Sequence, residues 1–363
     1  MRVLVLGGGG NFGARIVRAL RVDPQIELIV AGRRVMKVPG AVGVPGVALD
    51  IHAADFDERL RAVAPGVVIH CVGPFQGQDY RVAEAALAAG AHYLDLADAR
   101  SFVLHFAARV QGMAESAGRV AITGASTLPG LSSAVVAALS DGLSSVESIE
   151  TVIAPGQQAA RGAATLAAVF SYLGKPSPVW RNGAWVKTWG WMDLKRVRLD
   201  IGRRWAAACD VPDLMLFYKQ YPGIQTVRFH AALEFRLQHV VLWKLAGVRR
   251  LGLSWPVDRW AVGLDRWAAW FDPFAGKFGG MAVTVVGQRS DGGRVRRTWQ
   301  LIAPAKDGPE IPCMAATVLA RRLARGESIE SGARPCLGVL ALADFQPEFS
   351  KWGITTRVEE SEG

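Results

Sequence analysis

A G-x-G-x-x-G motif near the start of the chain has the spacing of a phosphate-binding turn. It directly follows the apolar run 2–6 and precedes the helical pattern 14–20. The first glycine permits the bend, the second lets a pyrophosphate approach the backbone, and the third lets helix and strand pack closely. Amides at the helix start then face the phosphates. We therefore predict a dinucleotide-binding site at Gly8, Gly10, Asn11, Phe12 and Gly13. The alternative is a glycine turn that binds no cofactor.

Two arginines follow the second apolar run, where NAD-binding proteins usually carry an acidic residue. The run 26–31 leads into Gly32, Arg33 and Arg34. A carboxylate there would hold ribose hydroxyls, whereas guanidinium groups bind a 2′-phosphate in a bidentate manner. The pair therefore favours NADP(H), and a solvated surface pair is the alternative. Asp50, at the end of the third predicted strand, completes this side of the predicted cofactor site.

The segment Gly73-Pro74-Phe75 directly follows the fourth apolar run, 67–72. Ligands of a doubly wound sheet lie at the carboxyl ends of its strands. We therefore expect these three residues to border the nicotinamide ribose of the cofactor. The alternative interpretation is an ordinary turn between a strand and a helix.

Two residues that could exchange a proton lie on the fifth predicted strand, 92–96. Tyr93 and Asp95 are two residues apart and share one face of that strand, and Asp98 follows shortly after it. A phenol or carboxylate held there could donate a proton as hydride reaches a substrate. These three residues are our predicted catalytic groups. A structural role is the alternative for all three, and Asp98 could instead cap the following helix.

Composition limits the remaining possibilities. The 363 residues carry 42 Lys and Arg against 32 Asp and Glu, which gives a net charge of +10. This excess could steer an anionic cofactor or favour an anionic membrane surface. The basic residues are dispersed without a nucleic-acid motif, so we expect no nucleic-acid partner. Histidines and the four cysteines lack metal-ligand spacing, which predicts no metal site and a reducing, cytoplasmic location.

The elements that position these residues alternate regularly up to residue 123. Six short apolar runs with intervening helices predict a doubly wound parallel sheet, an α/β fold. The pattern changes near residue 145, and Asp291-Gly292 between the runs 280–288 and 294–303 predicts a β-hairpin. We predict a dinucleotide-binding domain over 1–144 and an α+β domain with a mixed or antiparallel sheet over 145–350. Residues 351–363 either return to the first domain or fray.

Several segments resemble the saccharopine dehydrogenase family, in an NADP-dependent, reductase-like bacterial branch. They are VLVLGGGGNFG, VGPFQGQDYRVAEAALAAGAHYLDLAD, TGASTLPGLS, DGPEIPCMAATVLARRLA and GARPCLGVLALADF. The resemblance in the first domain covers about 140 residues. It implies a Rossmann domain, a second α+β domain, use of NADP and a homodimer.

The chain also departs from that family's pattern. Leu128-Pro129-Gly130 stands where relatives that bind amino acids tend to carry Asp-Pro-Gly. Counterparts of the charged clamps for diamino or dicarboxylic substrates are not evident. Saccharopine and polyamine-type substrates are therefore in doubt, and Leu128 better suits the relatives that act as enoyl reductases on lipid chains.

The segment 236–280 holds five of the twelve tryptophans. Trp260, Leu264, Trp267 and Phe271 recur at helical spacing, with arginines among them. Such a segment could pack against the second sheet, form a dimer contact, line an apolar pocket or lie in a membrane interface. Packing or a dimer contact is the interpretation that we favour.

The sequence as a whole predicts an NADPH-dependent oxidoreductase that transfers hydride to a C=N, C=O or activated C=C bond of a small molecule. The cofactor would carry the hard chemistry and the protein would orient the reacting atoms. One alternative is an enoyl-reductase-like enzyme acting on an apolar acyl substrate at a membrane surface. The other is a non-catalytic NADP-binding sensor, because fold alone does not establish catalysis.

Overall fold

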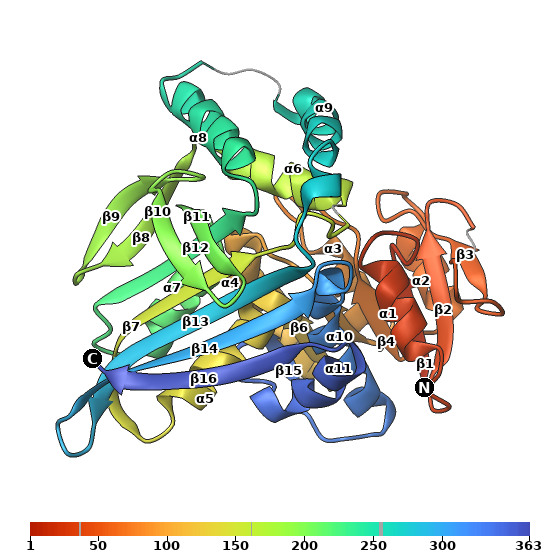
Figure 1. Ribbon diagram of the computed structural model, residues 1–363. Coiled ribbons are helices and arrows are strands. Elements are labelled where there is room, and N and C mark those ends of the chain that lie inside the picture. The colour runs from red at the N-terminus through yellow and green to blue at the C-terminus, as the bar shows by residue number, and fades with distance from the viewer. Residues whose placement is uncertain (36–37, 161, 254–256) are drawn as a thin grey trace. The chain divides into compact units, whose positions relative to one another are not determined.

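The computed structural model describes residues 1–35, 38–160, 162–253 and 257–363 (Figure 1). The chain forms two compact units. Unit 1 comprises Met1–Leu131 and Pro309–Leu340, and unit 2 comprises Ser132–Gly308 and Ala341–Gly363. Each unit therefore contains two separate stretches of the sequence.

Unit 1 is built on a seven-stranded parallel sheet with the order β3-β2-β1-β4-β5-β6-β15. The strand order reverses between β1 and β4, which makes their carboxyl ends the switch point where ligands bind in such sheets. All residues of β4 and β6 are buried, as expected for central strands covered on both faces. The strands are β1 (Arg2–Leu6), β2 (Glu27–Gly32), β3 (Gly46–Ala48), β4 (Val67–His70), β5 (His92–Asp95), β6 (Val120–Thr123) and β15 (Gly332–Pro335).

The helices of unit 1 confirm the predicted alternation of strands and helices, with one addition. The addition is α10, which contacts α1 (Figure 1). Arg321 on α10 donates a hydrogen bond to the Ala19 carbonyl over 3.0 Å. The helices are α1 (Gly13–Leu20), α2 (Phe56–Val63), α3 (Arg81–Ala88), α4 (Arg100–Ser116), the short η1 (Thr127–Leu131) and α10 (Ile311–Ala324).

The predicted division into 1–144 and 145–350 differs from the two compact units at both ends, because the first stretch of unit 1 ends at Leu131 and the chain later returns to that unit. Residues 309–340 belong to unit 1, because β15 extends the parallel sheet beyond β6 and α10 covers α1. The physical reason is the open edge of β6, whose backbone groups need a partner. Ala333 pairs with Ala121, and the Cys336 amide donates to the Thr123 carbonyl over 2.8 Å. A local pattern does not show which sheet a distant strand will join.

Unit 2 contains a seven-stranded mixed sheet with the order β10-β11-β12-β7-β13-β14-β16. Only β12 and β7 pair in parallel among these neighbours. A separate hairpin joins β8 and β9. The strands are β7 (Leu143–Ala154), β8 (Pro176–Arg181), β9 (Ala184–Trp189), β10 (Lys195–Leu199), β11 (Gly202–Ala208), β12 (Thr226–Leu233), β13 (Phe278–Arg289), β14 (Arg294–Pro304) and β16 (Thr355–Glu362).

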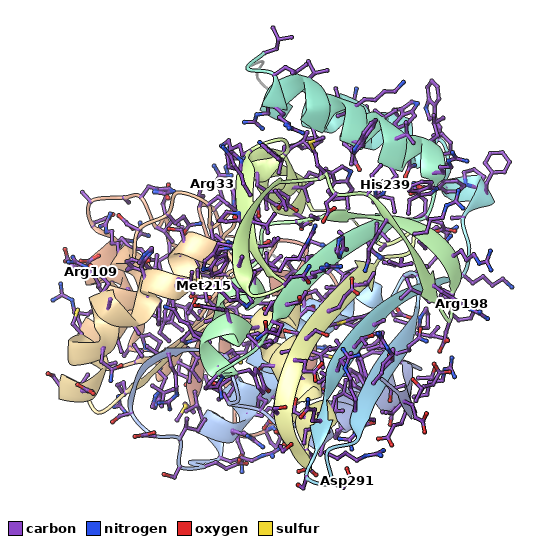
Figure 2. All side chains as sticks on the ribbon, turned by 90° about the vertical axis from the view of Figure 1, so that its left-hand side faces the viewer. Arg33, Arg109, Arg198, Met215, His239 and Asp291 are labelled. Atoms are coloured by element: carbon purple, nitrogen blue, oxygen red, sulfur yellow. The ribbon has the colours of Figure 1, made fainter. Side chains whose placement is uncertain are left out.

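The predicted hairpin forms between β13 and β14, with Asp291 at its tip (Figure 2). One Asp291 carboxylate oxygen accepts the Gly293 amide over 2.8 Å, and Gly292 has a φ of 85°, which favours glycine. The prediction that residues 351–363 fray or return to the first domain is wrong, because β16 pairs with β14. The polarity of β16 reflects its place at the sheet edge, where Glu360 pairs with Arg289 and Arg297.

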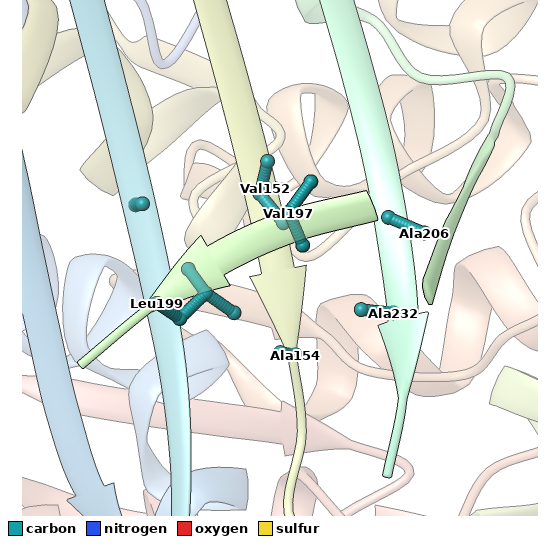
Figure 3. Packing of buried hydrophobic residues seen from close by; sticks show 7 residues of the cluster. Val152, Ala154, Val197, Leu199, Ala206 and Ala232 are labelled. Carbon is teal, nitrogen blue, oxygen red and sulfur yellow. The ribbon is translucent and has the colours of Figure 1, made fainter. Parts of the chain in front are cut away.

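The apolar core of unit 2 includes a layer formed where β10 crosses over the sheet (Figure 3). Val197 and Leu199 of β10 pack against Val152 of β7. Small side chains allow this close approach, because a larger residue at any of these positions would hold β10 away from the sheet. They are Ala154, Ala206, Ala232 and Ala282.

The helices of unit 2 include the tryptophan-rich segment. They are α5 (Ser132–Ser140), α6 (Ala163–Tyr172), α7 (Asp213–Gln220), α8 (Arg236–Arg250), α9 (Val257–Ala269) and α11 (Gln346–Lys351), with the short η2 (Asp272–Phe274) and η4 (Leu342–Phe345). Trp267 packs on Phe271, with ring centroids 5.3 Å apart, whereas Trp270 is 76% exposed. Trp255 and the Trp260 side chain lie outside the described residues. None of the helices in the described part of the chain has the length and apolar character to cross a membrane.

Candidate dinucleotide-binding site

The glycine turn connects β1 to α1 at the switch point of the sheet. A Cβ at Gly13 would lie 2.3 Å from the Gly7 carbonyl oxygen, and one at Gly8 would lie 2.6 Å from Val30. These two glycines are therefore required by the protein's own packing. A Cβ at Gly10 would meet only the Gly7 oxygen, at 3.1 Å. Open space beside Gly10 fits the close approach of a pyrophosphate.

The first turn of α1 has no side-chain cap among the described residues. The Ala14 amide donates instead to the Gly10 carbonyl over 3.0 Å, and the Arg15 and Ile16 amides donate to the Phe12 carbonyl. The helix dipole at this end of α1 favours an anion. The open space beside Gly10 and the positive end of the α1 dipole together fit the phosphates of a dinucleotide.

Asn11 and Phe12 are held from behind by residues that the sequence analysis missed. Arg15 donates hydrogen bonds to the Asn11 backbone and side-chain oxygens and forms an ion pair with Glu310 over 3.0 Å. The Cys313 thiol lies 3.5 Å from the Phe12 carbonyl oxygen. Glu310 and Cys313 come from the C-terminal part of unit 1. They are about 300 positions from the turn, so no local pattern indicates their role.

Arg33 and Arg34 are exposed and directly follow β2. Neither guanidinium group has an ion-pair or hydrogen-bond partner among the residues that the structure describes. They are therefore available to a ligand at the carboxyl end of β2. Asp50, just after β3, uses one carboxylate oxygen to accept the His52 amide over 3.0 Å. Its role in holding a cofactor stays a prediction.

The Gly73-Pro74-Phe75 loop lies beside the glycine turn. A Cβ on Gly7 would be 3.0 Å from Val72, and the Cys71 amide donates to the Leu6 carbonyl. Gln78 fixes the loop by donating to the Val72 and Pro74 carbonyls, each over 2.7 Å. The Phe75 ring is buried among side chains that include His70 and Phe102. The loop is thus well ordered at the position expected for the nicotinamide side of a cofactor.

Tyr93 and Asp95 lie together on β5, as predicted, but both are enclosed. They are 1% and 0% exposed. Asp95 accepts hydrogen bonds from Tyr93, from the Thr123 hydroxyl and from the Ala97 and Gly124 amides. Burial raises the pKa of Asp95 to about 6 against the opposing effect of these hydrogen bonds, and burial also raises the pKa of Tyr93. This arrangement ties the ends of β5 and β6 together.

Asp98 differs from these two residues because it is exposed, although the protein around its carboxyl group still raises the pKa of Asp98 by partial burial. It accepts a hydrogen bond from the Gln76 amide over 3.3 Å, in the loop that follows β4. Among the three predicted catalytic residues, Asp98 is therefore the one that a substrate can reach without local rearrangement. The catalytic roles of all three stay predictions.

A parallel sheet of this order, with an uncapped glycine turn at its switch point, defines a dinucleotide-binding protein of the Rossmann class. Residues 3–122 match the family described as the saccharopine dehydrogenase NADP binding domain. The segment 3–122 therefore carries the NADP-binding domain of that family, and the resemblance predicted from the motifs is confirmed for this domain. No curated protein sequence matches the chain.

Solved structures resemble the chain over nearly its whole length. Saccharopine dehydrogenase (L-Glu forming) from Saccharomyces cerevisiae has a TM-score of 0.72 and 13% identity over 99% of each chain. Homospermidine synthase from Legionella pneumophila has a TM-score of 0.60 and 12% identity, covering 100% of this chain and 91% of that one. An engineered D-amino acid dehydrogenase bound to NADP+ has a TM-score of 0.50 and 16% identity, covering 96% and 98%. The shared feature is the fold of saccharopine dehydrogenase-like, NAD(P)-dependent oxidoreductases.

Proposed function

We propose that this protein is an NADPH-dependent oxidoreductase. The observation that carries the proposal is the combination, in unit 1, of a glycine turn without a side-chain cap and two exposed arginines at the end of the neighbouring strand that have no partner within the described part of the chain. The turn would bind the pyrophosphate, and Arg33 and Arg34 would bind the 2′-phosphate that distinguishes NADP from NAD.

The remaining site residues would position the other end of the cofactor. The 73–75 loop, held by Gln78, would border the nicotinamide ribose, and Asp98 would supply or relay a proton at its exposed carboxyl group. A bound nicotinamide cofactor supplies the hydride. The substrate would carry a C=N, C=O or activated C=C bond. The neighbour named as an engineered D-amino acid dehydrogenase supports the first two of these bond classes.

Cofactor preference tests the proposal. We expect the unmodified protein to bind NADPH more tightly than NADH in a fluorescence titration. Arg33→Ala with Arg34→Ala should weaken NADPH binding by about 1–3 kcal/mol, because charge-assisted hydrogen bonds are lost, and should leave NADH binding nearly unchanged. A matched control replaces the exposed Arg59 and Arg61 of α2. Equal affinities of the unmodified protein for the two cofactors would refute the NADP preference.

Catalysis is tested separately from binding. NADPH oxidation should occur with at least one member of a panel of imines, ketones and enoyl compounds, and Asp98→Asn should slow it. Tight NADPH binding without turnover on any of them would instead support the non-catalytic sensor.

A further inference from the structure

A polar layer closes one end of the apolar core in unit 2. Strand alternation places Glu150 before Val152 on β7, and Lys195 before Val197 on β10. The same alternation on β12 places Arg228 and His230 on the face that carries Ala232. Lys195 of β10 forms an ion pair with Glu150 of β7, which lies opposite Arg228 of β12 in the parallel ladder.

Most charges of this layer are paired. Lys195 forms an ion pair with Glu150, and their side chains are 30% and 29% exposed. Arg181, at the end of β8, forms an ion pair with Asp193. His230 is 2% exposed with its Nδ1 atom 3.3 Å from Glu150, and burial lowers its pKa to about 3, so it is neutral near pH 7. The cations Lys195, Arg181 and Arg228 face the carboxylates Glu150 and Asp193, so the layer holds one positive charge in excess.

Arg228 carries that charge. Its guanidinium group has no ion-pair or hydrogen-bond partner among the described residues, and its Nε atom is buried. Burial and the nearby Arg181 lower the pKa of Arg228, and Asp193, which forms its ion pair with Arg181, only partly opposes them. Burial, assisted by Arg228, likewise lowers the pKa of Lys195 to about 8. A buried donor without an acceptor costs free energy, and more so when it belongs to a charged group.

We propose that Arg228, with Lys195 and Arg181 beside it, forms a binding site for a small oxyanion, a carboxylate or a phosphate group. The planar guanidinium fork matches two oxygens of either group, and the neighbouring cations add attraction. The ligand would supply the acceptor that the protein does not provide to Arg228. All these residues belong to unit 2, so the site does not depend on the proposed use of NADPH.

The test measures anion-dependent thermal stability of the full chain without nucleotide, at constant ionic strength, with phosphate or succinate replacing chloride. Both anions should raise the melting temperature, because a ligand that binds only the folded state stabilises it. Arg228→Gln should weaken binding at least tenfold. Two controls should keep the response: Arg198→Gln, an exposed arginine on β10 (Figure 2), and Arg33→Ala with Arg34→Ala in unit 1.

The outcomes separate the ligand classes. A rise in melting temperature with succinate shows that the site binds carboxylates, and a rise with phosphate alone shows that it is specific for phosphate. Either result supports the proposal if the rise is lost in Arg228→Gln. Arg228→Lys keeps the positive charge but loses the planar guanidinium group, so it should bind the anion with intermediate strength. This variant keeps the test valid if Arg228→Gln does not fold. An undiminished response in Arg228→Gln, or no response of the unmodified protein to either anion, would overturn it.

Discussion

Within one turn, three glycines meet different physical demands. Gly8 and Gly13 have no room for a Cβ because neighbouring protein atoms occupy the space. A Cβ at Gly10 would meet only the Gly7 oxygen, so packing within the protein demands glycine there much less strictly. The missing side chain instead leaves room for the phosphates of a ligand. Substitutions should therefore separate folding from nucleotide binding within the same loop.

We expect Gly10→Val to weaken NADPH binding by about tenfold or more while circular dichroism and melting temperature stay near those of the unmodified protein. Gly13→Ala should lower the melting temperature, because its Cβ would overlap the Gly7 carbonyl. Fluorescence titration and thermal unfolding measure the two effects. If the valine variant bound NADPH normally, this loop would not be the phosphate cradle.

At the scale of elements, the helix α10 supports the glycine turn from a distant part of the sequence. The Arg15–Glu310 ion pair, with side chains 13% and 10% exposed, links that support to α1. A buried charge left without its partner is costly, so the pair matters most when one member is removed.

Glu310→Ala should lower the free energy of unfolding by about 1–3 kcal/mol and weaken NADPH binding, because Arg15 would lose its carboxylate partner and hold Asn11 less firmly. Denaturant unfolding and fluorescence titration measure these effects. The control is Glu327→Ala, a 44% exposed residue after α10 that pairs with Arg322. Equal stability of the two variants would contradict a supporting role for Glu310.

For the whole molecule, buried titratable groups make stability depend on pH. Burial lowers the pKa of His70 and His239 to about 4 and that of His230 to about 3. Below pH 6.5 these histidines take up protons in the unfolded chain but stay neutral in the folded protein. Protonation therefore favours the unfolded chain, and the free energy of unfolding decreases as the pH falls from 6.5 towards 4. Burial raises the pKa of Asp95 to about 6 and that of Asp213 to about 7. These two carboxyl groups take up protons more readily in the folded protein, so their effect on the free energy of unfolding is opposite: it increases as the pH falls from 7 to 3.8.

With His92, whose pKa burial lowers to about 4, four histidines outnumber the three carboxyls whose pKa burial raises, Asp95, Asp98 and Asp213, so the melting temperature should fall between pH 6.5 and 4. His239, on α8, is fully buried against Trp191 and has no hydrogen-bond partner for either ring nitrogen among the described residues (Figure 2). His239→Phe should therefore reduce this fall, measured by thermal unfolding across the pH range. His105→Phe, at an exposed histidine of α4, should leave it unchanged. An unchanged slope in the His239 variant would exclude its contribution.

The sequence by itself determined the local features of this protein. Glycine spacing specified the turn after β1, and apolar runs specified six of the seven parallel strands, because both depend on residues close in the chain. The hairpin at Asp291 was predictable for the same reason. The family model likewise matches one continuous segment of unit 1, residues 3–122.

Only the tertiary structure decided which distant elements meet. It placed β15 and Glu310 in unit 1, paired β16 with β14, and enclosed Asp95 while leaving Asp98 exposed. It also brought Lys195, Arg228 and Glu150 together from three strands. Strand edges, apolar side chains and charged groups find their partners across long sequence separations. The periodicity of a short segment therefore does not indicate which distant residues those partners are.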